Sequence, residues 1–411
     1  MPFDRDLEAP EAAAGQRLVS LDEALALVCA QPPLGRTERV ALDDAGGRVL
    51  ARTVRARRCA PSADVAAMDG FAVRDADLRA PSNALELIGE ALAGRPFAGA
   101  LTPGACVRVA TGAPTPAGAD RVVVQEEATV SGHRVFLPDC ATQKRHIRLA
   151  GSDFRAGDVM VEAGAVLTAG SLMAIAAANR SHVDVFARPR VAILATGDEL
   201  AEPGQAMGCA QIPDSVSIGI AEMARAAGAN VVLRQRYADD LPSLRKAAED
   251  AADLADLVVV TGGASVGPRD YARAMFEQRG LGLVFAKVAI KPGKPVWLGR
   301  SGGTLILGLP GNPTAAFVTA RLFVIPLLAR LASADPSAVL AWRPHRLASP
   351  LEATGEAECL VPAQRSPDGV RPFATRDSSA QRSLGSLHHL IRRRPLSPAA
   401  AVGEMAETLD A

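Results

Sequence analysis

The sequence has 411 residues, of which 48% are hydrophobic, so it holds enough apolar side chain for several folded domains and is not a largely disordered chain. Lys plus Arg and Asp plus Glu number 45 each, which excludes an overall basic field that would attract nucleic acid or an anionic membrane. Aromatic residues make up only 4%, which argues against the stacking surfaces of proteins that bind single-stranded nucleic acid.

The cysteine pattern and the N-terminus indicate the compartment. The six cysteines are scattered and form no CxxC motif, which disfavours structural zinc and a disulfide framework and favours a reducing compartment. Residues 1–17 are acidic, lack the apolar core of a signal peptide and are typical of a flexible leader. Arg321, Pro326 and Arg330 interrupt the most apolar stretch, residues 315–331, which favours a core helix over a membrane span. We therefore expect a cytoplasmic protein with no nucleic-acid or membrane partner.

The N-terminal part of the chain predicts a helical and linker domain and a β-rich module. Ser20-Leu-Asp-Glu23 is a capping-box pattern, and apolar residues follow it at helical spacing. From Thr37 to about residue 150, short β-type runs alternate with Gly and Pro turns. We assign residues 18–45 and 147–187 to the helical and linker domain, with its first helix available to pack on the following α/β domain, and residues 46–146 to the β-rich module.

From residue 191 onward, short apolar strands alternate with amphipathic helices, which is the pattern of a doubly wound, mostly parallel sheet. A helix is expected to begin at Tyr271, after one of these strands. We assign residues 188–335 to this α/β domain. After residue 336 β-type runs return, so residues 336–411 are expected to form a small C-terminal β domain with a barrel-like form. The predicted fold class is multidomain α/β plus β.

The turn at residues 261–270, with the sequence TGGASVGPRD, has the features of a ligand site. It follows a buried strand, and ligands collect at the carboxyl ends of strands in open α/β sheets. Thr261 and Ser265 supply hydroxyl groups, and Asp270 supplies a carboxylate. Three glycines permit a sharp turn or a close approach to a ligand: Gly262, Gly263 and Gly267. The alternative is an ordinary βα loop with a capping Asp.

Charged residues on other loops of the α/β domain extend this hypothesis. Glu199, Asp239 and Asp270 fall at loop positions, and clustered carboxylates suit a hard cation such as Mg²⁺, with phosphate oxygens completing its shell. Lys291 and Lys294 flank prolines on a further loop, where they suit a phosphate or another oxyanion. The pattern indicates a phosphorylated or nucleotide-bearing ligand with a metal. The alternative is three helix N-caps and a solvated basic loop.

Other chemistries lack their motifs. The sequence contains no HExxH zinc motif, no Walker A phosphate loop and no Rossmann glycine fingerprint. Asp69 and Thr111 lie in turn-type segments of the β-rich module, and each taken alone is a common turn former.

Several separated segments agree on one family. They are MDGFAV at 68–73, ATGAP at 110–114, IRLAGSD at 147–153, TGDEL at 196–200, ADD at 238–240, TGGASVGPRD at 261–270, KVAIKPGKP at 287–295 and GLPGNPTAAF at 308–317. Jointly and in this order they resemble the molybdopterin molybdenumtransferases, the MoeA and gephyrin E-domain family. The resemblance implies an elongated homodimer with four domains per chain and an α/β domain of the molybdopterin-binding type. It also implies insertion of molybdate into adenylylated molybdopterin with loss of AMP.

The resemblance further implies roles for individual residues. The pterin and nucleotide pocket would include Thr261, Gly262, Gly263, Ser265, Gly267, Gly311, Asn312, Pro313 and Ser379. Lys291 and Lys294, with Lys287 nearby, would hold molybdate or the pterin phosphate. Mg²⁺ and the adenylate would be handled by Glu199, Asp239 and Asp270. The partner subunit of the homodimer would bring Asp69, Thr111, Arg148 and Asp153 to the cleft. The expected catalytic set is Glu199, Asp239, Asp270, Lys291, Lys294 and Asp69.

The chain departs from the family pattern at some positions, and two further interpretations stay open. An Arg of the last domain is replaced by Val361, and the Asn of an Asp-Ser-Asn motif by Val216. A divergent paralogue that binds molybdopterin or partner enzymes without turnover fits these changes. A molybdopterin adenylyltransferase fits the shared TGGASVGPRD, although the long β module and KPGKP argue against it. A molybdopterin adenylyltransferase and molybdoenzyme apoproteins are the expected protein partners.

Overall fold

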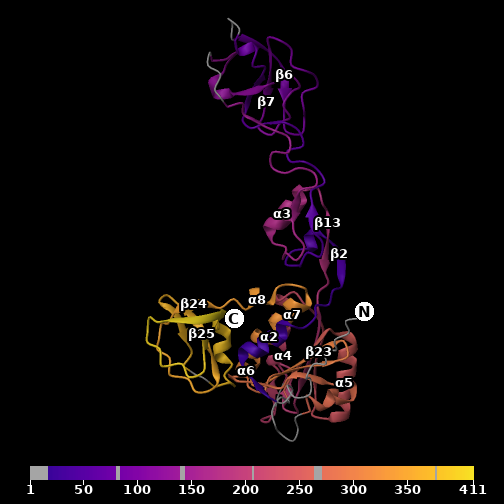
Figure 1. Cartoon of the computed structure of the whole chain (residues 1–411), viewed down its shortest axis with the longest axis vertical. Helices are drawn as coiled ribbons and strands as arrows, with labels where there is room; N and C mark the ends of the chain where they lie inside the picture. Colours follow the sequence, from indigo (N-terminus) through magenta and orange to yellow (C-terminus); the bar gives the residue numbers. More distant parts are fainter. Residues whose placement is uncertain (1–16, 80–83, 139–143, 206–207, 263–270, 375–376) are drawn as a thin grey trace, which may run out of the picture. The chain divides into compact units, whose positions relative to one another are not determined.

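The computed structural model describes residues 17–79, 84–138, 144–205, 208–262, 271–374 and 377–411. The chain divides into two compact units: Met1–Glu38 with Phe186–Ala411 form the first, and Arg39–Val185 form the second. The first unit therefore combines segments from both ends of the sequence. In Figure 1 its N-terminal helix α2 (Leu21–Cys29), drawn in indigo, lies among helices formed much later in the chain.

The centre of the first unit is a mixed sheet. Six strands of the described chain form it in the order β17-β14-β18-β23-β22-β19. The first four run parallel and the last two are antiparallel to their neighbours. Their bounds are β14 (Arg190–Thr196), β17 (Asn230–Tyr237), β18 (Leu257–Thr261), β19 (Gly282–Phe285), β22 (Trp297–Ser301) and β23 (Thr304–Leu309). The mostly parallel α/β arrangement expected from the alternating pattern is thus present.

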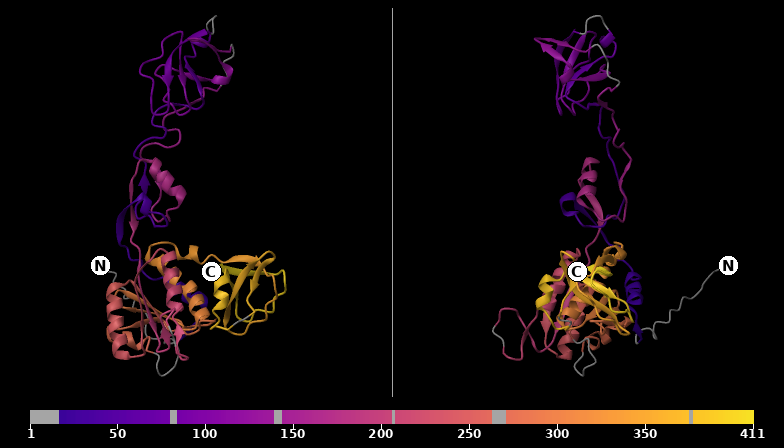
Figure 2. Two further views of the ribbon diagram at one scale, coloured as in Figure 1. Left: turned by 180° about the vertical axis from the view of Figure 1, so that it is seen from behind. Right: turned by 90° about the vertical axis from the view of Figure 1, so that its left-hand side faces the viewer.

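Both faces of this sheet are buried, which explains the continuous apolar runs of its strands. In β14, Val191 and Ile193 pack in one core cluster, and Ala192 and Leu194 pack in another. Helix α5 (Leu241–Leu254) covers the second cluster, whereas the first is covered by α4 (Val216–Ala226), α6 (Pro313–Thr319) and α7 (Ile325–Leu331). Figures 1 and 2 show α5 and the other helices on opposite sides of the sheet.

The apolar segment after β23 is a helix of this core. It runs as α6, a π-helical turn (Ala320–Val324) and α7. Its length and hydropathy match a membrane span, but 78% of its apolar window is buried inside the structure. The segment behaves as the core helix expected from its interrupting arginines.

The helix expected from Tyr271 is different in the structure. The chain forms a 3₁₀ helix at Ala274–Arg279, in which Met275 and Phe276 are buried. It ends at Gly280, which has a φ of 70° and so leaves the helix through the left-handed region. The prediction of an α-helix here was wrong, because the helical segment has 3₁₀ geometry and begins at Ala274.

The C-terminal domain of the first unit is built on a second sheet of the order β21-β25-β27-β28-β24, with β26 paired to β25. The bounds are β21 (Ile290–Lys291), β24 (Arg343–Arg346), β25 (Glu358–Ser366), β26 (Gly369–Pro372), β27 (His389–Arg393) and β28 (Met405–Asp410). Strand β21 belongs to the α/β segment but pairs in parallel with β25. The α/β segment therefore supplies the edge strand of the C-terminal sheet. The barrel-like closure expected for this domain stays a prediction.

The second unit contains a β-rich module. Its main sheet has the order β8-β5-β7-β6-β10-β9, with core clusters that include Val107 and Ala72 on one face and Cys106 and Phe71 on the other. The strands are β5 (Gly70–Val73), β6 (Ala84–Ala91), β7 (Ala105–Val109), β8 (Arg121–Val124), β9 (Thr129–Ser131) and β10 (Arg134–Phe136). The remainder of the unit has the helix α3 (Ala169–Ala177) and three pairs of short strands. The pairs are β2 (Thr37–Ala41) with β13 (His182–Phe186), β3 (Val54–Arg55) with β12 (Val159–Val161), and β4 (Val65–Ala66) with β11 (Ile147–Arg148).

A buried ion network fastens α2 to the C-terminal domain. The Arg392 side chain, 5% exposed, pairs with Glu358, which is 7% exposed, and its Nη2 lies 2.6 Å from Asp22 Oδ1 at the start of α2. Its guanidinium also lies over the Trp342 ring, 5.1 Å from the centroid. Helix α2 itself begins with Ser20, whose hydroxyl accepts a hydrogen bond from the Glu23 amide at 3.1 Å.

We expect Arg392→Met to destabilise the first unit by about 3–5 kcal/mol, because it leaves the Glu358 carboxylate buried without a counter-charge. Urea unfolding followed by tryptophan fluorescence measures this change, since Trp342 lies under Arg392. The matched control is Arg394→Met, whose side chain is 56% exposed and should cost below about 1 kcal/mol. Equal losses from the two variants would contradict a special role for the buried network.

Candidate functional site

The chain topology creates a crevice at the carboxyl ends of β14 and β18. From β14 the chain passes through α4 to β17 on one side, and from β17 it crosses through α5 to β18 on the other side of β14. The loops after β14 and β18 therefore leave the sheet in different directions. Such a switch point is where open α/β sheets bind ligands. The last residues of the two strands, Thr196 and Thr261, are both buried there.

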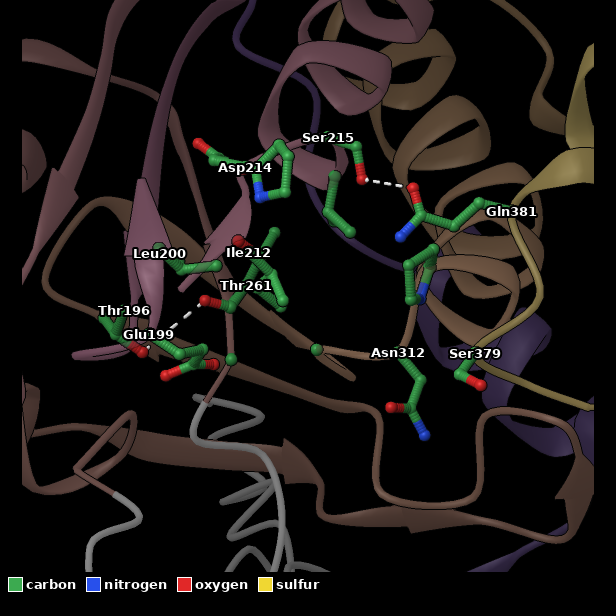
Figure 3. Close-up of a pocket in the computed structure, with 15 residues that line it drawn as sticks. Thr196, Glu199, Leu200, Ile212, Asp214, Ser215, Thr261, Asn312, Ser379 and Gln381 are labelled. Atoms are coloured by element: carbon green, nitrogen blue, oxygen red, sulfur yellow. Dashed lines mark hydrogen bonds between the residues drawn. The ribbon is translucent and has the colours of Figure 1, made fainter. Parts of the chain in front are cut away.

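A cavity of about 360 Å³ occupies this crevice, and we call it the switch-point cavity. Its volume lies within the range of roughly 300–1,000 Å³ that is typical of small-molecule sites. Figure 3 shows the residues that line it, which are Thr196, Glu199, Leu200, Ile212, Pro213, Asp214, Ser215, Val216, Thr261, Gly262, Gly311, Asn312, Pro313, Ser379 and Gln381. Six of the predicted residues thus line one cavity: Glu199, Thr261 and Gly262 from the loop pattern, and Gly311, Asn312 and Pro313 from the family resemblance. Ser379, expected from the resemblance, joins them from the C-terminal domain.

Gly262 is required by the close approach of two turns. Its φ is +91°, and a Cβ built on it would lie 2.3 Å from the carbonyl oxygen of Thr196. A Cβ on Gly311 would in turn lie 3.5 Å from the Cα of Gly262. The ends of β14, β18 and β23 therefore meet through backbone. This leaves peptide groups, rather than side chains, to face a ligand.

Glu199 is the free carboxylate of the cavity. It folds back over Gly197, where an added Cβ would lie 2.5 Å from a Glu199 carboxylate oxygen. Within the described part of the chain, its carboxylate has no hydrogen-bond or ion-pair partner. It is exposed at the cavity, so it can accept a metal ion or a ligand donor.

Asp214, by contrast, is a structural carboxylate that fixes the start of α4. It is 2% exposed and accepts hydrogen bonds from the Ser217 amide, at 3.0 Å, and from the Ser217 hydroxyl. Arg234 Nη1 donates to the same hydroxyl at 2.9 Å. Helix α4 therefore begins at a fixed point on the cavity wall. The Asp214 carboxylate already caps the first turn of α4 and offsets the partial positive charge of the helix start.

The C-terminal domain closes one side of the cavity. The Ser215 hydroxyl donates to Gln381 Oε1 at 3.0 Å, which joins the start of α4 to the C-terminal domain, as Figure 3 shows. Asn312 Nδ2 donates to Ser378 Oγ at 3.0 Å, and the Thr314 amide donates to the Ser378 carbonyl at 2.9 Å. Ser215 and Gln381 were not among the residues expected from the sequence. No motif marks Gln381, which reaches the site only through packing of the last domain.

The predicted lysines lie apart from the switch-point cavity. Lys291 lines a smaller cavity of about 100 Å³, which we call the lysine cavity, together with Pro292, Thr314, Cys359, Leu360, Val361, Pro362, Asp377 and Ser383. Val361 contributes an apolar wall. The Ser379 amide and hydroxyl donate to Asp377 and hold the pKa of its carboxyl below the usual range. Among the described lining residues, Lys291 is thus the one cation and Asp377 the one anion.

The other two lysines do not line either cavity. Lys287 is half-buried in β20 (Lys287–Val288), whose backbone pairs with β1 (Leu18–Val19). Lys294 is exposed, and its carbonyl accepts a hydrogen bond from the Val288 amide at 3.0 Å. Their predicted role with molybdate or phosphate stays a prediction.

In the second unit, Asp69 and Thr111 form a defined pair. The Asp69 carboxylate accepts hydrogen bonds from the Thr111 amide at 2.6 Å and from its hydroxyl at 2.7 Å. These bonds lower the pKa of Asp69, so the group is an ionised carboxylate on an exposed turn. Arg148 lies in the short strand β11 and Asp153 in the following exposed turn, where its amide donates to Ala60.

Of the three carboxylates predicted to bind Mg²⁺, only those of Glu199 and Asp239 belong to described residues. Gly263, Ser265, Gly267 and Asp270 lie outside the described residues. Asp239 follows β17, with its amide donating to Asp198 Oδ1 at 3.0 Å, and does not line the switch-point cavity. No group of three His, Cys, Asp or Glu that could hold a metal occurs within the described ranges. Mg²⁺ needs only one or two carboxylates beside phosphate and water, so the exposed Glu199 fits such an ion.

Comparisons with known proteins cover most of the chain. Residues 19–179 match the MoeA N-terminal region (domain I and II), and residues 192–330 match a probable molybdopterin binding domain. A molybdopterin molybdenumtransferase of Haemophilus influenzae is 35% identical over 316 residues, which are 76% of this chain and 78% of the relative. A molybdopterin molybdenumtransferase 2 of Mycobacterium tuberculosis is 36% identical over 343 residues, 81% of each chain.

A solved structure agrees with these relatives. It is that of a molybdopterin biosynthesis MoeA protein from Pyrococcus horikoshii, which is 26% identical, has a TM-score of 0.83, and is matched over 95% of this chain and 98% of that one. The switch-point cavity lies in the part that matches the molybdopterin binding domain, apart from Ser379 and Gln381. On these matches, the chain belongs to the molybdopterin molybdenumtransferase family.

Proposed function

We propose that this chain inserts molybdate into adenylylated molybdopterin and releases AMP, in a Mg²⁺-dependent step of molybdenum cofactor biosynthesis in the cytoplasm. The observation that carries the proposal is the switch-point cavity, where Gly262 and Gly311 bring backbone to a ligand beside the exposed Glu199. Because no Arg or Lys is among the described residues that line this cavity, phosphate charge there would be offset by a metal ion.

The acidic residues of the site would hold Mg²⁺. Glu199 would bind it from the loop after β14, together with Asp239, which follows β17, and Asp270, which lies outside the described residues. When bound, the ion would neutralise the phosphoanhydride so that AMP can leave. Asp214 has no such role in the proposal, because Ser217 and Arg234 already occupy its carboxylate.

The lysine cavity would receive the oxyanion. Lys291 is held on β21, opposite Cys359 of β25, so its position is fixed by the pairing of two domains. Pro313 borders the switch-point cavity and Thr314 borders the lysine cavity, which places the two cavities next to each other. Molybdate held by Lys291 would therefore lie near the pterin end of the substrate.

A second copy of the chain would complete the cleft. Asp69, Thr111, Arg148 and Asp153 belong to the second unit, and in a homodimer they would reach the site of the other subunit. The ionised Asp69 could then act as a base or as a further metal ligand. Molybdopterin adenylyltransferase, which supplies the substrate, and apoproteins that receive the cofactor are the proposed protein partners.

The direct test supplies adenylylated molybdopterin, molybdate and Mg²⁺ to the purified chain and measures AMP and cofactor. We expect release of AMP that depends on molybdate, and its loss in Glu199→Gln. Glu202→Gln is the matched control, because Glu202 pairs with Arg236 outside the cavity and should retain activity. Binding of the substrate without AMP release at any molybdate concentration would instead identify the non-catalytic paralogue. Formation of adenylylated molybdopterin from ATP would identify an adenylyltransferase.

Lys291→Ala should raise the KM for molybdate by about 10- to 100-fold, because a charge-assisted hydrogen bond of about 1.5–3 kcal/mol is lost and Asp377 remains as an uncompensated anion. Steady-state rates at varied molybdate and saturating pterin substrate measure the effect. Lys246→Ala on α5, whose ammonium pairs with Asp250 at 2.7 Å, should leave this KM unchanged. An unchanged KM in Lys291→Ala would place the oxyanion elsewhere.

Thr111→Val should move the acidic limb of the kcat/KM profile to higher pH. The Thr111 amide and then its hydroxyl lower the pKa of Asp69, and the substitution removes the hydroxyl bond. The pKa of Asp69 therefore rises, and a larger fraction of it is protonated on the acidic side. A pH–rate series measures the shift, with Thr129→Val on the exposed strand β9 as the control. An unmoved limb would show that another group sets it.

A further inference from the structure

The lysine cavity contains one group that opposes the oxyanion it would receive. Its volume of about 100 Å³ lies below the roughly 300–1,000 Å³ of most small-molecule sites, so a small ligand such as a tetrahedral oxyanion suits it. Of its described lining residues, Lys291 brings a positive charge and Asp377 a negative one. An anion there gains one attraction and meets one repulsion. The charge of these residues therefore does not by itself hold an oxyanion.

The Asp377 carboxylate has a fixed position on the cavity wall. Its Oδ1 accepts hydrogen bonds from the Ser379 amide at 2.9 Å and from the Ser379 hydroxyl at 2.8 Å. The turn that carries both residues is fastened to the start of α6. There the Thr314 amide donates to the Ser378 carbonyl at 2.9 Å, and the Thr314 hydroxyl donates to the Ala380 carbonyl at 2.5 Å. Turning the carboxylate would break its two bonds to Ser379.

The second carboxylate oxygen of Asp377 decides which ligands suit the cavity. Both bonds from Ser379 end on Oδ1, and no hydrogen bond to Oδ2 occurs within the described part of the chain. The two bonds lower the pKa of the carboxyl, so the group is ionised near neutral pH and can only accept hydrogen bonds. A ligand atom opposite Oδ2 must therefore bring a hydrogen of its own.

The other polar side chains of the cavity are available to the rest of the ligand or are already occupied. Lys291 on β21 and Cys359 on β25 are the other titratable groups among its described lining residues. The Cys359 thiol is directed to the Ala357 carbonyl, with 3.7 Å from Sγ to the oxygen. The Thr314 hydroxyl already donates to a backbone carbonyl. The Lys291 ammonium and the Ser383 hydroxyl remain as donors to a ligand.

Tetrahedral oxyanions differ in whether they carry a hydrogen for Asp377. Sulfate holds no proton in neutral solution, so all of its oxygens are acceptors. Hydrogenphosphate keeps an O–H group, and molybdate gains one when it is protonated to hydrogenmolybdate. An oxyanion without a proton would set an acceptor against Oδ2, and like charges at close range oppose binding. A protonated oxyanion would replace that repulsion by a hydrogen bond from its O–H group to the carboxylate, which is one of the stronger kinds.

We propose that Asp377 makes the lysine cavity select oxyanions that carry a proton, so that hydrogenmolybdate binds and sulfate is rejected. Lys291 donates to an unprotonated oxygen of the ligand, and Asp377 accepts from its O–H group. The proposal rests on the proposed function, because it takes the lysine cavity as the site of the oxyanion. Asp377 is then a specificity-determining residue, and sulfate does not compete with molybdate for the cavity.

Calorimetric titration of the full chain with molybdate alone, between about pH 6 and about pH 8, tests the proposal. The dianion predominates in this range, so each bound oxyanion takes up a proton, and the Kd should rise about tenfold per pH unit. In Asp377→Asn, the amide oxygen still accepts from Ser379 and the amide N–H offers a donor to the ligand. The dependence of the Kd on pH should then be lost, because binding no longer requires the proton.

Competition between sulfate and phosphate gives an independent readout. At about pH 7, phosphate should bind the wild type at least about tenfold more tightly than sulfate, because only phosphate carries a proton for Asp377. Asp377→Asn should abolish this preference by admitting sulfate. Cys359→Ala should keep both the preference and the pH dependence, since the thiol is directed to a backbone carbonyl.

The matched control is Asp335→Asn. Asp335 accepts from the Ser337 amide at 2.9 Å and from the Ser337 hydroxyl at 2.7 Å, but it does not line the lysine cavity, so its variant should behave as the wild type. A wild-type Kd for molybdate that does not change with pH, sulfate that binds as tightly as phosphate, or no binding of either molybdate or phosphate would overturn the proposal. The proposed function is tested separately, by molybdate-dependent AMP release, which a chain without this selectivity could still perform.

Discussion

The parallel alignment of β14, β18 and β23 is the constraint on which the site depends. Ala195 is in register with Thr261, and Thr261 with Leu309, so the three strands end at the same edge of the sheet. The turns that follow must then share a small volume, and glycine at position 262 is what permits it. The apolar alternation of these strands toward two cores holds the register, since a slip by one residue would exchange the two faces.

The site also depends on the contact between the α/β domain and the C-terminal domain. The β21–β25 pairing, the Ser215–Gln381 bond and the Asn312–Ser378 bond join the two across the cavity edge. One side of the cavity is thus fixed by the sheet, whereas the side that closes it is fixed by a separate domain. Differences among family members in the last domain can therefore change what the cavity accepts without changing the sheet.

Residues on the sheet side of the switch-point cavity could be predicted from the sequence much better than residues on its C-terminal-domain side. Thr261, Gly262 and Glu199 lie at or shortly after strand ends, so the local pattern placed them on the loops of the α/β sheet. Gly311 was expected from the family resemblance. Gln381 lies in a segment with no periodicity or motif and reaches the site through a contact 166 residues distant in the chain. The lysines show a different limit of prediction from sequence, since neighbours in the chain need not lie at the same site. Lys291 and Lys294 are neighbours in sequence, but only Lys291 lines a cavity, because its position depends on pairing with a strand of another domain.

The position of α2 has a consequence for how the chain becomes folded during synthesis. The Asp22–Arg392 contact joins residues 370 positions apart, and α2 buries Leu21 and Val28 in a core made of later segments. The second unit, residues 39–185, is complete long before these partners leave the ribosome, and domains generally fold as units as they emerge. The apolar face of α2 therefore has no core to pack against until the chain has been made as far as α7, which ends at Leu331.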